Sequence, residues 1–331
     1  MLKKLIYLMV LTMFVFFMHP AAESYDMKEG LNQDYATEWL NMYILPNYDT
    51  SKIEQVNSTQ SHSVEYDIGE PFTVEAGDIA MTIGSEFQGD FNIINNGVFH
   101  MVLVNDGVIT GLYTNSDEVT VNSINIQGMD RDAIHDVYGD PVKTVDKGGK
   151  HLIVENDEYD VFEVDDIYAF FFYDLHESDK VNGLLVAKTS EMKAGDGMYN
   201  HPSVMDNEMM NYHLINSARL QYGIGPLEFD KGAGAAARKH SDDMADNTYF
   251  SHESPEGSTL KDRIVEEEVK FRLAGENIAM GHTSPIFSHH SLMNSKEHRV
   301  NTLNDTYTHV GIGVGYSAEE VPYYTENYIE K

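Results

Sequence analysis

The residues of this chain whose types and spacing suit chemistry lie near its C-terminal end, between residues 249 and 315. His252 follows Tyr-Phe-Ser, Glu276 stands in Gly-Glu-Asn-Ile-Ala, and His298 begins His-Arg-Val-Asn. Two neutral imidazoles and one carboxylate can bind Zn²⁺ and leave a coordination position for water. Because loops on a rigid scaffold often carry function, we expect these three Gly-, Ser- and Asn-rich segments to meet at one cleft.

Each of these side chains also has a structural role open to it. His252 could hydrogen-bond loop backbone, Glu276 could accept amide N–H groups that tie a loop to the core, and His298 could be buried beside a carboxylate. His240 stands at helical spacing from Met244, which favours a scaffold role over a ligand role. The residue types leave both interpretations of the trio open.

The motifs of the commonest hydrolases and nucleotide-binding proteins are absent from the sequence. It contains no Gly-x-Ser-x-Gly, no His-Glu-x-x-His and no P-loop. The Gly-rich run 311–315 alternates as a strand and precedes no helix, so it is not a dinucleotide-binding loop. The chain also has no cysteine, which excludes disulfides, thiolate catalysis and thiolate metal sites.

Hydrophobic periodicity predicts the elements that must position these residues. One amphipathic helix covers about residues 209–222, and a second begins with Asp230 as N-cap and reaches about residue 247. The Ala/Gly run 232–237 in the second helix indicates close packing against a neighbour. Two short helices (286–295 and 297–303) and two antiparallel strands (309–316 and 321–329) complete the prediction for this part of the chain.

The segment from 64 to 190 has the alternation of strands and contains a repeat. Asn105-Asp106-Gly107, between two strand-like runs, is a strong hairpin signal. Ile68-Gly69-Glu70-Pro71 recurs as Tyr138-Gly139-Asp140-Pro141, and the copies end alike, at 108–112 and 181–185. Two copies are too few for a solenoid, so we predict a pseudo-symmetric α+β pair.

The formal net charge of −32 comes from 54 acidic and 22 basic residues, and more than half of it falls between residues 65 and 190. A surface this negative repels phosphate backbones, which argues against nucleic acid as a partner. The simplest interpretation of this negative charge is that it keeps the protein soluble. The alternative is that it attracts divalent cations or a cationic cell-wall environment.

The N-terminus has the pattern of a secretory signal. Two lysines at positions 3 and 4 precede an apolar run from 5 to 18, and His-Pro-Ala-Ala follows, with Ala22 as the expected cleavage site. An uncleaved membrane anchor is the alternative, although the run is shorter than the roughly 20 residues that span a bilayer. We therefore predict an exported protein, secreted or held at the cell envelope. The predicted divisions are a signal or anchor (1–22), a linker (23–63), an acidic two-repeat domain (64–190), a second linker (191–204) and a C-terminal domain (205–331).

A series of motifs in the last part of the chain has the order and spacing of one known family. They are Ile215–Arg219 with Pro226-Leu227, Ala237–Ala245, Tyr249–His252, Gly275–Ala279, Asn294-Ser295 with His298–Asn301, and Val310–Gly313. Through them residues 205–331 resemble a bacterial CAP-superfamily domain, the domain of cysteine-rich secretory proteins, antigen 5 and plant pathogenesis-related proteins. Residues 64–190 resemble the CAP-associated N-terminal domain of some exported Bacillus-type proteins. The resemblance implies an α+β chain in which an α-β-α sandwich follows a pseudo-repeated α+β domain.

The same resemblance implies a set of cleft residues. In many eukaryotic members two His and two Glu line a central cleft and can hold a divalent ion. His252, Glu276 and His298 match three of these positions. The fourth, a glutamate, falls near Ser295, and Glu297 is the nearest substitute. Zn²⁺ is the ion that such a set could hold.

Three functions remain as hypotheses. The first is a non-enzymatic exported protein whose cleft binds a small or lipid-like ligand or a cell-wall component. Lipid or sterol binding is what the resemblance to eukaryotic members implies. The second is a metal-dependent hydrolase of peptide or cell-wall substrates, using His252, Glu276 and His298. The third is a protein-interaction module that acts through the acidic repeat domain.

Overall fold

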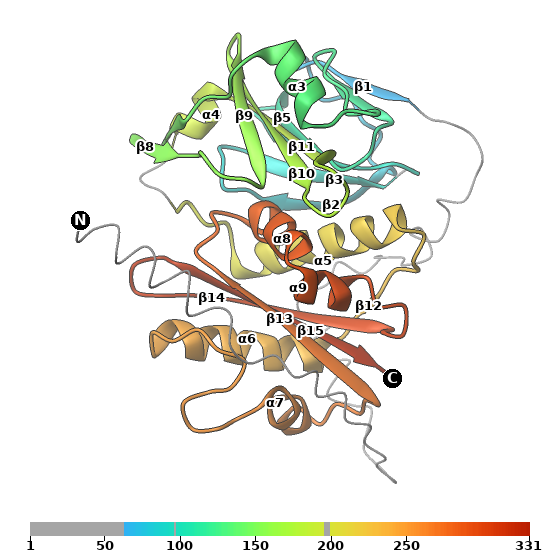
Figure 1. Cartoon of the computed structure of the whole chain (residues 1–331), viewed down its shortest axis with the longest axis vertical. Helices are drawn as coiled ribbons and strands as arrows, with labels where there is room; N and C mark the ends of the chain where they lie inside the picture. Colours follow the sequence, from blue (N-terminus) through green and yellow to red (C-terminus); the bar gives the residue numbers. More distant parts are fainter. Residues whose placement is uncertain (1–62, 96, 195–198) are drawn as a thin grey trace.

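The computed structural model of the chain describes residues 63–95, 97–194 and 199–331. The predicted signal or anchor at 1–22 and almost all of the linker predicted at 23–63 lie outside them. Within the described residues, no helix combines the length and the apolar character needed to cross a membrane. The elements stack along the long axis of the molecule, with one large sheet in each half (Figure 1).

Seven antiparallel strands form the sheet of the first half, in the order β2-β3-β4-β5-β11-β10-β9. The predicted hairpin joins β4 (Phe99–Asn105) to β5 (Val108–Thr114), and both turn residues, Asp106 and Gly107, have positive φ, 49° and 78°. A type I′ turn requires that conformation at both positions, which explains the Asp-Gly pair. The other strands are β2 (Ile79–Gly84), β3 (Asp90–Asn95), β9 (Tyr159–Val164), β10 (Ile167–Asp174) and β11 (Lys180–Lys188).

The sequence repeat appears in the order of these strands. β5 and β11, in which the two copies end, pair antiparallel in the sheet, with Leu184 opposite Thr114 and Ala187 opposite Gly111. β4 and β3 lie on one side of this pair, and β10 and β9 occupy the equivalent places on the other. The copies differ farther out, because β2 extends the sheet whereas β7 (Thr144–Lys147) and β8 (Lys150–Ile153) form a separate hairpin.

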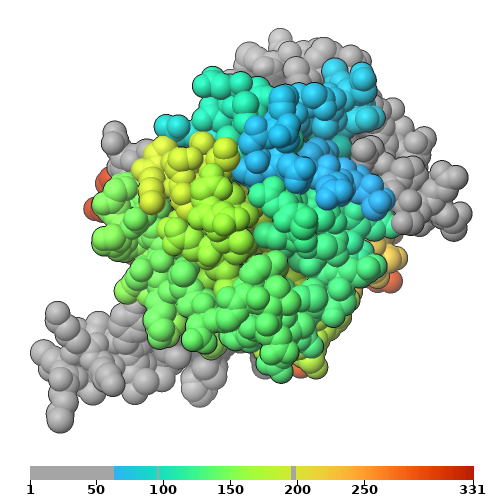
Figure 2. Space-filling model, turned by 90° about the horizontal axis from the view of Figure 1, so that it is seen from above, coloured from blue at the N-terminus to red at the C-terminus, as the bar shows by residue number. Residues whose placement is uncertain are grey.

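The remaining elements of the first half cover this sheet. β1 (Val64–Tyr66) pairs in parallel with β6 (Val119–Val121), and helix α3 (Arg131–Tyr138) buries Ile134 in the same cluster. Helix α4 (Thr189–Lys193) follows β11 directly and buries Met192 in the core on the other face. Seen from above, these segments, coloured blue to yellow, form one end of the molecule (Figure 2).

The second half has three layers. Its four-stranded sheet has the order β12-β14-β15-β13. Helices α6 (Lys231–Asp246) and α7 (Leu260–Glu266) lie on one side, and α5 (Val204–Gln221), α8 (Pro285–Asn294) and α9 (Lys296–Thr302) lie on the other (Figure 1). The strands are β12 (Glu228–Phe229), β13 (Leu273–Met280), β14 (His309–Tyr316) and β15 (Pro322–Glu330). The predicted α-β-α sandwich and the α+β class of the chain are confirmed.

The Ala/Gly run of α6 packs closely against the Gly-rich strand β14. A Cβ on Gly313 would lie 1.9 Å from the backbone nitrogen of Arg238, and one on Gly311 would lie 2.1 Å from that of Gly234. Helix α6 therefore lies directly against the backbone of β14, which only glycine permits. The close packing predicted for residues 232–237 is confirmed, and its neighbour is β14.

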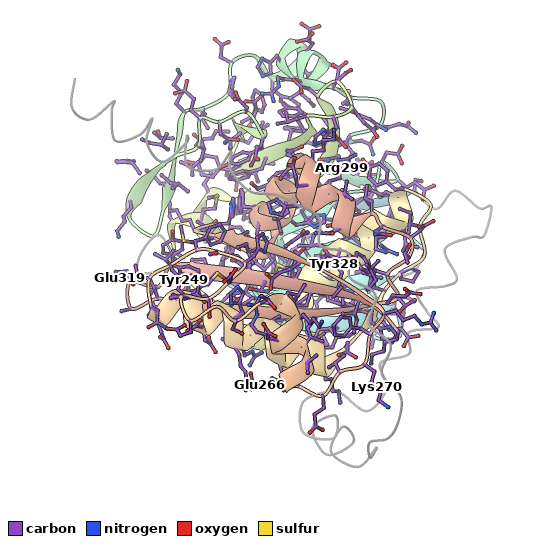
Figure 3. All side chains as sticks on the ribbon, turned by 60° about the horizontal axis from the view of Figure 1, so that its bottom comes forward. Tyr249, Glu266, Lys270, Arg299, Glu319 and Tyr328 are labelled. Atoms are coloured by element: carbon purple, nitrogen blue, oxygen red, sulfur yellow. The ribbon has the colours of Figure 1, made fainter. Side chains whose placement is uncertain are left out.

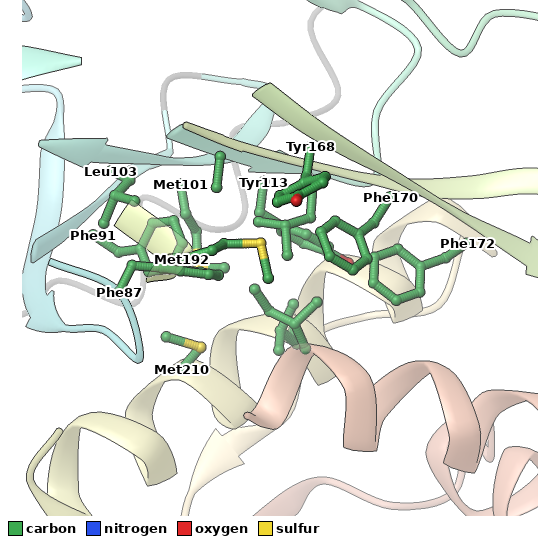
Figure 4. Close-up of a cluster of buried hydrophobic side chains, with 14 of the residues drawn as sticks. Phe87, Phe91, Met101, Leu103, Tyr113, Tyr168, Phe170, Phe172, Met192 and Met210 are labelled. Atoms are coloured by element: carbon green, nitrogen blue, oxygen red, sulfur yellow. The ribbon is translucent and has the colours of Figure 1, made fainter. Parts of the chain in front are cut away.

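The two halves share one hydrophobic core. Met210 and Leu214 from α5 and Ile286 from α8 belong to the same buried cluster as the aromatic side chains beneath the first sheet. Figure 4 shows this cluster, with Phe170 and Phe172 pointing from the sheet toward the helices of the second half. Separating the two halves would therefore expose apolar surface to water.

Helices α8 and α9 also contact the first half through polar and aromatic side chains. His290 stacks on Phe172 with ring centroids 4.0 Å apart, and its Nε2 lies 3.0 Å from the hydroxyl of Tyr113. A Cβ on Gly183 would lie 2.6 Å from the same imidazole, so this glycine makes room for α8. Arg299 of α9 forms an ion pair with Asp174, the last residue of β10, at 2.8 Å, and Figure 3 shows its place.

Candidate functional site

Glu276 is the centre of the candidate site. It lies on β13, and both of its carboxylate oxygens are hydrogen-bonded. Oε1 lies 2.8 Å from Nδ1 of His252, and Oε2 accepts from Nη2 of Arg263 at 2.6 Å. Arg263 comes from α7, which begins with a capping box between Thr259 and Asp262. The side chains of Glu276 and Arg263 are only 3% and 8% exposed, so their ion pair is buried.

The surroundings keep Glu276 ionised. Burial by itself would raise the pKa of this carboxyl, but the hydrogen bond with His252 and the charge of Arg263 outweigh burial and hold the pKa below its ordinary value. An ionised carboxylate can only accept, so Nδ1 of His252 carries the proton in their hydrogen bond. When His252 is neutral, its Nε2 is then an acceptor. The His252 side chain is 45% exposed, which leaves it accessible to a ligand.

His240 lies behind this group. It is 1% exposed, and its Nε2 bonds to the carbonyl oxygen of Ser251 at 3.0 Å, next to His252 in the chain. Burial lowers the pKa of His240, so its neutral form is favoured. This contact holds the segment that carries His252 and gives His240 a structural role.

His298 lies in the first turns of α9, in a half-buried position. Its Nδ1 lies 2.7 Å from Oγ of Ser295, the residue that precedes the helix. Burial, with a smaller effect from nearby His252, lowers the pKa of His298 to about 4, so the imidazole is neutral at pH 7. Glu297 is exposed and does not join the buried carboxylate group around Glu276.

Asn277 connects the Gly-Glu-Asn strand to the motif that carries His298. It donates to the carbonyl oxygen of His298 at 3.2 Å and to Oε2 of Glu326 at 3.1 Å, and its Oδ1 accepts from Asn301 at 2.9 Å. The Gly-Glu-Asn strand is therefore bound through side chains to the helix that carries His298. The sequence analysis assigned no role to Asn277 or Asn301, and their places within the two motifs were the only available signal.

Two of the three predicted site residues do not lie in loops. Glu276 is in strand β13 and His298 in helix α9, and only His252 lies in a loop. The glycine that suggested a loop serves close packing instead, because a Cβ on Gly275 would lie 2.3 Å from the hydroxyl of Tyr307. His298 therefore lies in the helix predicted at 297–303, whereas the strand that carries Glu276 was not predicted.

The side chains present do not fit a divalent metal ion. Each oxygen of Glu276 keeps a second lone pair, but the side chain is 3% exposed and its oxygens are held by His252 and Arg263, so a metal ion would have to displace these partners. Among residues 63–95, 97–194 and 199–331, no three His, Asp or Glu side chains are grouped as a metal site requires. A mechanism through Zn²⁺ has no support in this arrangement.

Comparisons with known proteins agree with this architecture. The description of the cysteine-rich secretory protein family (CAP) matches residues 212–328, and that of the CAP-associated N-terminal family matches residues 77–195. The chain is 41% identical over 118 residues to the "uncharacterized membrane protein YlbC" of Bacillus subtilis, a match that covers 36% of this chain and 33% of that protein. It is 36% identical over 129 residues to the "uncharacterized protein YkwD" of the same organism, covering 39% of this chain and 49% of that protein. The chain thus spans a third to a half of the length of these relatives.

Two solved structures share the fold over most of the chain. An extracellular protein containing a SCP domain from Bacillus anthracis is similar with a TM-score of 0.66 at 22% identity, covering 93% of this chain and all of that one. A cysteine-rich secretory protein from Staphylococcus aureus has a TM-score of 0.61 at 19% identity, covering 80% of this chain and 94% of that one. At such identities the likeness concerns the fold alone. The chain therefore carries a bacterial CAP domain of the cysteine-rich secretory protein family at residues 212–328, preceded by a CAP-associated N-terminal domain at residues 77–195.

Proposed function

We propose that this chain is an exported, non-catalytic binding protein of the cell envelope, whose CAP domain holds a polar envelope component through His252 and His298. One observation carries the proposal, namely that both oxygens of Glu276 are engaged by His252 and Arg263. A general base needs access to the substrate's proton and a pKa near the working pH. The Glu276 side chain is only 3% exposed and its pKa is held below the ordinary value, so its position fits a structural role that orients His252.

The two histidines remain as the groups that can meet a ligand. Each is held through Nδ1, His252 by Glu276 and His298 by Ser295, and neither Nε2 has a hydrogen bond to another described residue. Nδ1 of His252 carries the proton, so its Nε2 accepts from a hydroxyl or amide N–H donor, whereas Nε2 of His298 accepts when Nδ1 donates to Ser295 and donates when Nδ1 accepts from it. Cell-wall glycans and peptides present both kinds of donor.

A hydrolase has less support from the geometry. The contact between Ser295 and His298 has the residue types of a nucleophile and its base, but such pairs work with a third group that orients the base. No carboxylate is hydrogen-bonded to His298 within the described part of the chain. With a pKa lowered to about 4, His298 is also a weak base at neutral pH.

A lipid-like ligand is less favoured than a polar one at this site. Pockets that enclose apolar ligands are concave and largely apolar. A cavity of ≈ 290 Å³ with aromatic and charged side chains in its lining lies between the two halves and is not lined by His252, Glu276 or His298. The exposed His252 suits contact with a polymer at the surface.

Export is supported by the N-terminal sequence and by the relatives. The lysine pair and apolar run have the order of a secretory signal. The similar Bacillus anthracis protein is described as extracellular, and YlbC as a membrane protein. The third hypothesis, a partner-facing role for the acidic first half, is the alternative to binding by the CAP domain.

The test measures sedimentation of the full chain with purified, insoluble cell wall at neutral pH. We expect saturable binding that weakens about tenfold in the double variant His252→Gln, His298→Gln, because two hydrogen bonds contribute about 0.5–1.5 kcal/mol each. His151→Gln is the matched control, since this histidine is 82% exposed and lies in the first half. Unchanged binding by the double variant contradicts the proposal. Release of soluble wall fragments by the wild type, lost in the double variant, would instead support the hydrolase.

The deletion of residues 64–190 is not a usable test. Met210, Leu214 and Ile286 of the second half pack in the core of the first. Removing either half exposes this surface, so loss of binding would report misfolding. A surface variant of the intact chain separates the two explanations without this difficulty.

A further inference from the structure

A buried histidine lies at the centre of the contact between α8 and the first sheet. The ring of His290 stacks on Phe172 of β10 with centroids 4.0 Å apart, and its Nε2 lies 3.0 Å from the hydroxyl of Tyr113 on β5. Gly183 of β11, the strand between them, leaves room for this ring. Figure 4 shows Tyr113 and Phe172 on the side of the sheet that faces the helices. One imidazole of the CAP domain therefore contacts three adjacent strands of the other half.

The surroundings of His290 fit a neutral ring only. Its hydrogen bond with the fully buried Tyr113 occupies Nε2, whereas Nδ1 is buried and has no hydrogen-bond partner among the described residues. A protonated imidazole donates through both nitrogens, so a second proton would leave a buried charge with one possible acceptor. Such a charge loses its hydration without gaining a counter-charge. Attraction to the face of Phe172 offsets only part of that loss.

Two further buried histidines stand beside this contact. His289 precedes His290 in α8, and their ring centroids are 5.6 Å apart. A positive charge on His289 would therefore repel one on His290. His213 lies on α5, the helix that packs beside α8. Burial opposes protonation of all three rings.

The charged residues around His290 do not compensate for a positive ring. β5 and α8 contain no lysine, arginine, aspartate or glutamate. Burial lowers the pKa of His290 well below its ordinary value, and repulsion by His289 adds to this effect. Those on the other adjoining elements stand at strand ends or have other partners, namely Lys180 and Lys188 at the ends of β11, Asp174 with Arg299, Glu158 with Ser291, Asp206 with Ser203, Glu208 with Arg238, and Arg219 with backbone carbonyls.

These histidines make the contact between the halves depend on pH. A histidine in water has a pKa of about 6.5, whereas burial lowers the pKa of His289 and of His213 to about 4. A state in which α8 moves away from the sheet hydrates the rings and binds protons that the closed state excludes. Above pH 6.5 the rings are neutral in both states, so the closed state keeps its full advantage. As pH falls below 6.5, the open state gains up to about tenfold per pH unit for each histidine that becomes hydrated.

We propose that His290 makes the junction of the two halves an acid-sensitive switch. The junction is closed while His290 is neutral, and acid favours an open state in which α8 has moved away from the first sheet and the ring is protonated. His289 and His213 strengthen the response where opening hydrates them. Opening exposes the apolar cluster that the two halves share. The CAP site around Glu276 takes no part in this switch, so either proposal can fail without the other.

Thiol labelling measures the opening, because the chain has no cysteine of its own. Ser217→Cys places a thiol at the junction, since Ser217 is buried and its Oγ accepts from Nδ2 of Asn115 at 2.9 Å. Ser241→Cys is the matched control, because Ser241 is equally buried but lies on α6, on the far side of the second sheet. Val137→Cys, at a site that is 63% exposed, gives the rate of a free thiol at each pH. The readout is the rate of reaction of the full chain with 4,4′-dithiodipyridine, divided by the rate of Val137→Cys at the same pH.

We expect the relative labelling of Ser217→Cys to rise by at least about 25-fold from pH 7 to pH 5. One histidine that is hydrated only in the open state gives this factor. Adding His290→Gln should reduce the rise by about the same factor, because the amide can still bond to Tyr113 but does not titrate. Comparing the ratio between the two pH values removes any constant effect of the lost stacking. His151→Gln, at an exposed site in the first half, should leave the rise unchanged.

Three results overturn the proposal. An equal rise with and without His290→Gln would assign the pH effect to other groups. Labelling of Ser217→Cys that does not rise between pH 7 and pH 5 would remove the switch. An equal rise for Ser217→Cys and Ser241→Cys would show acid unfolding of the whole chain instead of opening at the junction. This last comparison needs no change at His290, so it decides the matter even where His290→Gln does not fold.

Discussion

Replacing Glu276 by Gln tests whether this residue has a structural role through its buried ion pair with Arg263. The substitution keeps the shape of the side chain but removes the charge opposite Arg263, whose side chain is 8% exposed. It also turns one acceptor into an amide N–H₂ group, which repels the guanidinium donors. Breaking a buried ion pair by removing one partner costs about 3–5 kcal/mol. Domains have about 5–15 kcal/mol of stability, so a large share of the free energy of unfolding is at stake.

Urea denaturation followed by circular dichroism measures this loss. The matched control is Glu266→Gln, which makes the same chemical change on a side chain that is 69% exposed and 3.9 Å from Lys239. We expect the control to stay within about 0.5 kcal/mol of wild type. The double variant Glu276→Gln, Arg263→Met should lose less free energy of unfolding than the sum of the two single variants, because each single change leaves the other partner buried and unpaired. A stability loss below about 1 kcal/mol for Glu276→Gln, or strict additivity of the two single losses, would refute this structural role.

Two further predictions concern pH and packing. The pKa of Glu276 is lowered in the folded chain, so its contribution to stability is fully present above the unfolded value of about 4.3 and is lost as pH falls through the folded value. The stability lost in Glu276→Gln, measured by urea midpoints, should therefore be smaller at pH 3 than at pH 5. An equal loss at both pH values would contradict this. Gly183→Ala should destabilise the protein by about 1–3 kcal/mol, because the added Cβ would lie 2.6 Å from the stacked ring of His290. Gly225→Ala is the control and should be tolerated, because its Cβ would have no atom within 4 Å. Equal thermal midpoints for the two variants would contradict the packing of α8 on β11.

Most of the elements could be predicted because their signals are local. Asp230 was identified as an N-cap from its place before a periodic run, and its Oδ1 accepts from the backbone nitrogen of Ala233 at 2.7 Å. The repeat predicted the symmetry of the first sheet. Strand β13 and helix α7 were missed, since Gly-Glu-Asn within β13 has the composition of a loop. The Thr259–Asp262 spacing was the available signal for α7.

The site was predicted only in part. The histidines and Glu276 were singled out by type and motif, but whether Glu276 would face a metal, a substrate or a cation could not be read from them. Arg263 decides that question, and its charge looks the same in sequence as that of any surface arginine. Burial turns it into the fixed partner of a carboxylate, and burial depends on how α7 packs against β13.

By itself, the sequence determined most of the strands and helices, the close packing of the Ala/Gly run in α6, and the CAP and CAP-associated motifs. These follow from periodicity, turn chemistry and spacing, which act over a few residues or a few turns. Only the tertiary structure decided that Glu276 is buried against Arg263 and that the two halves share a hydrophobic cluster. Both depend on which distant groups are brought together and screened from water, and no local pattern records that.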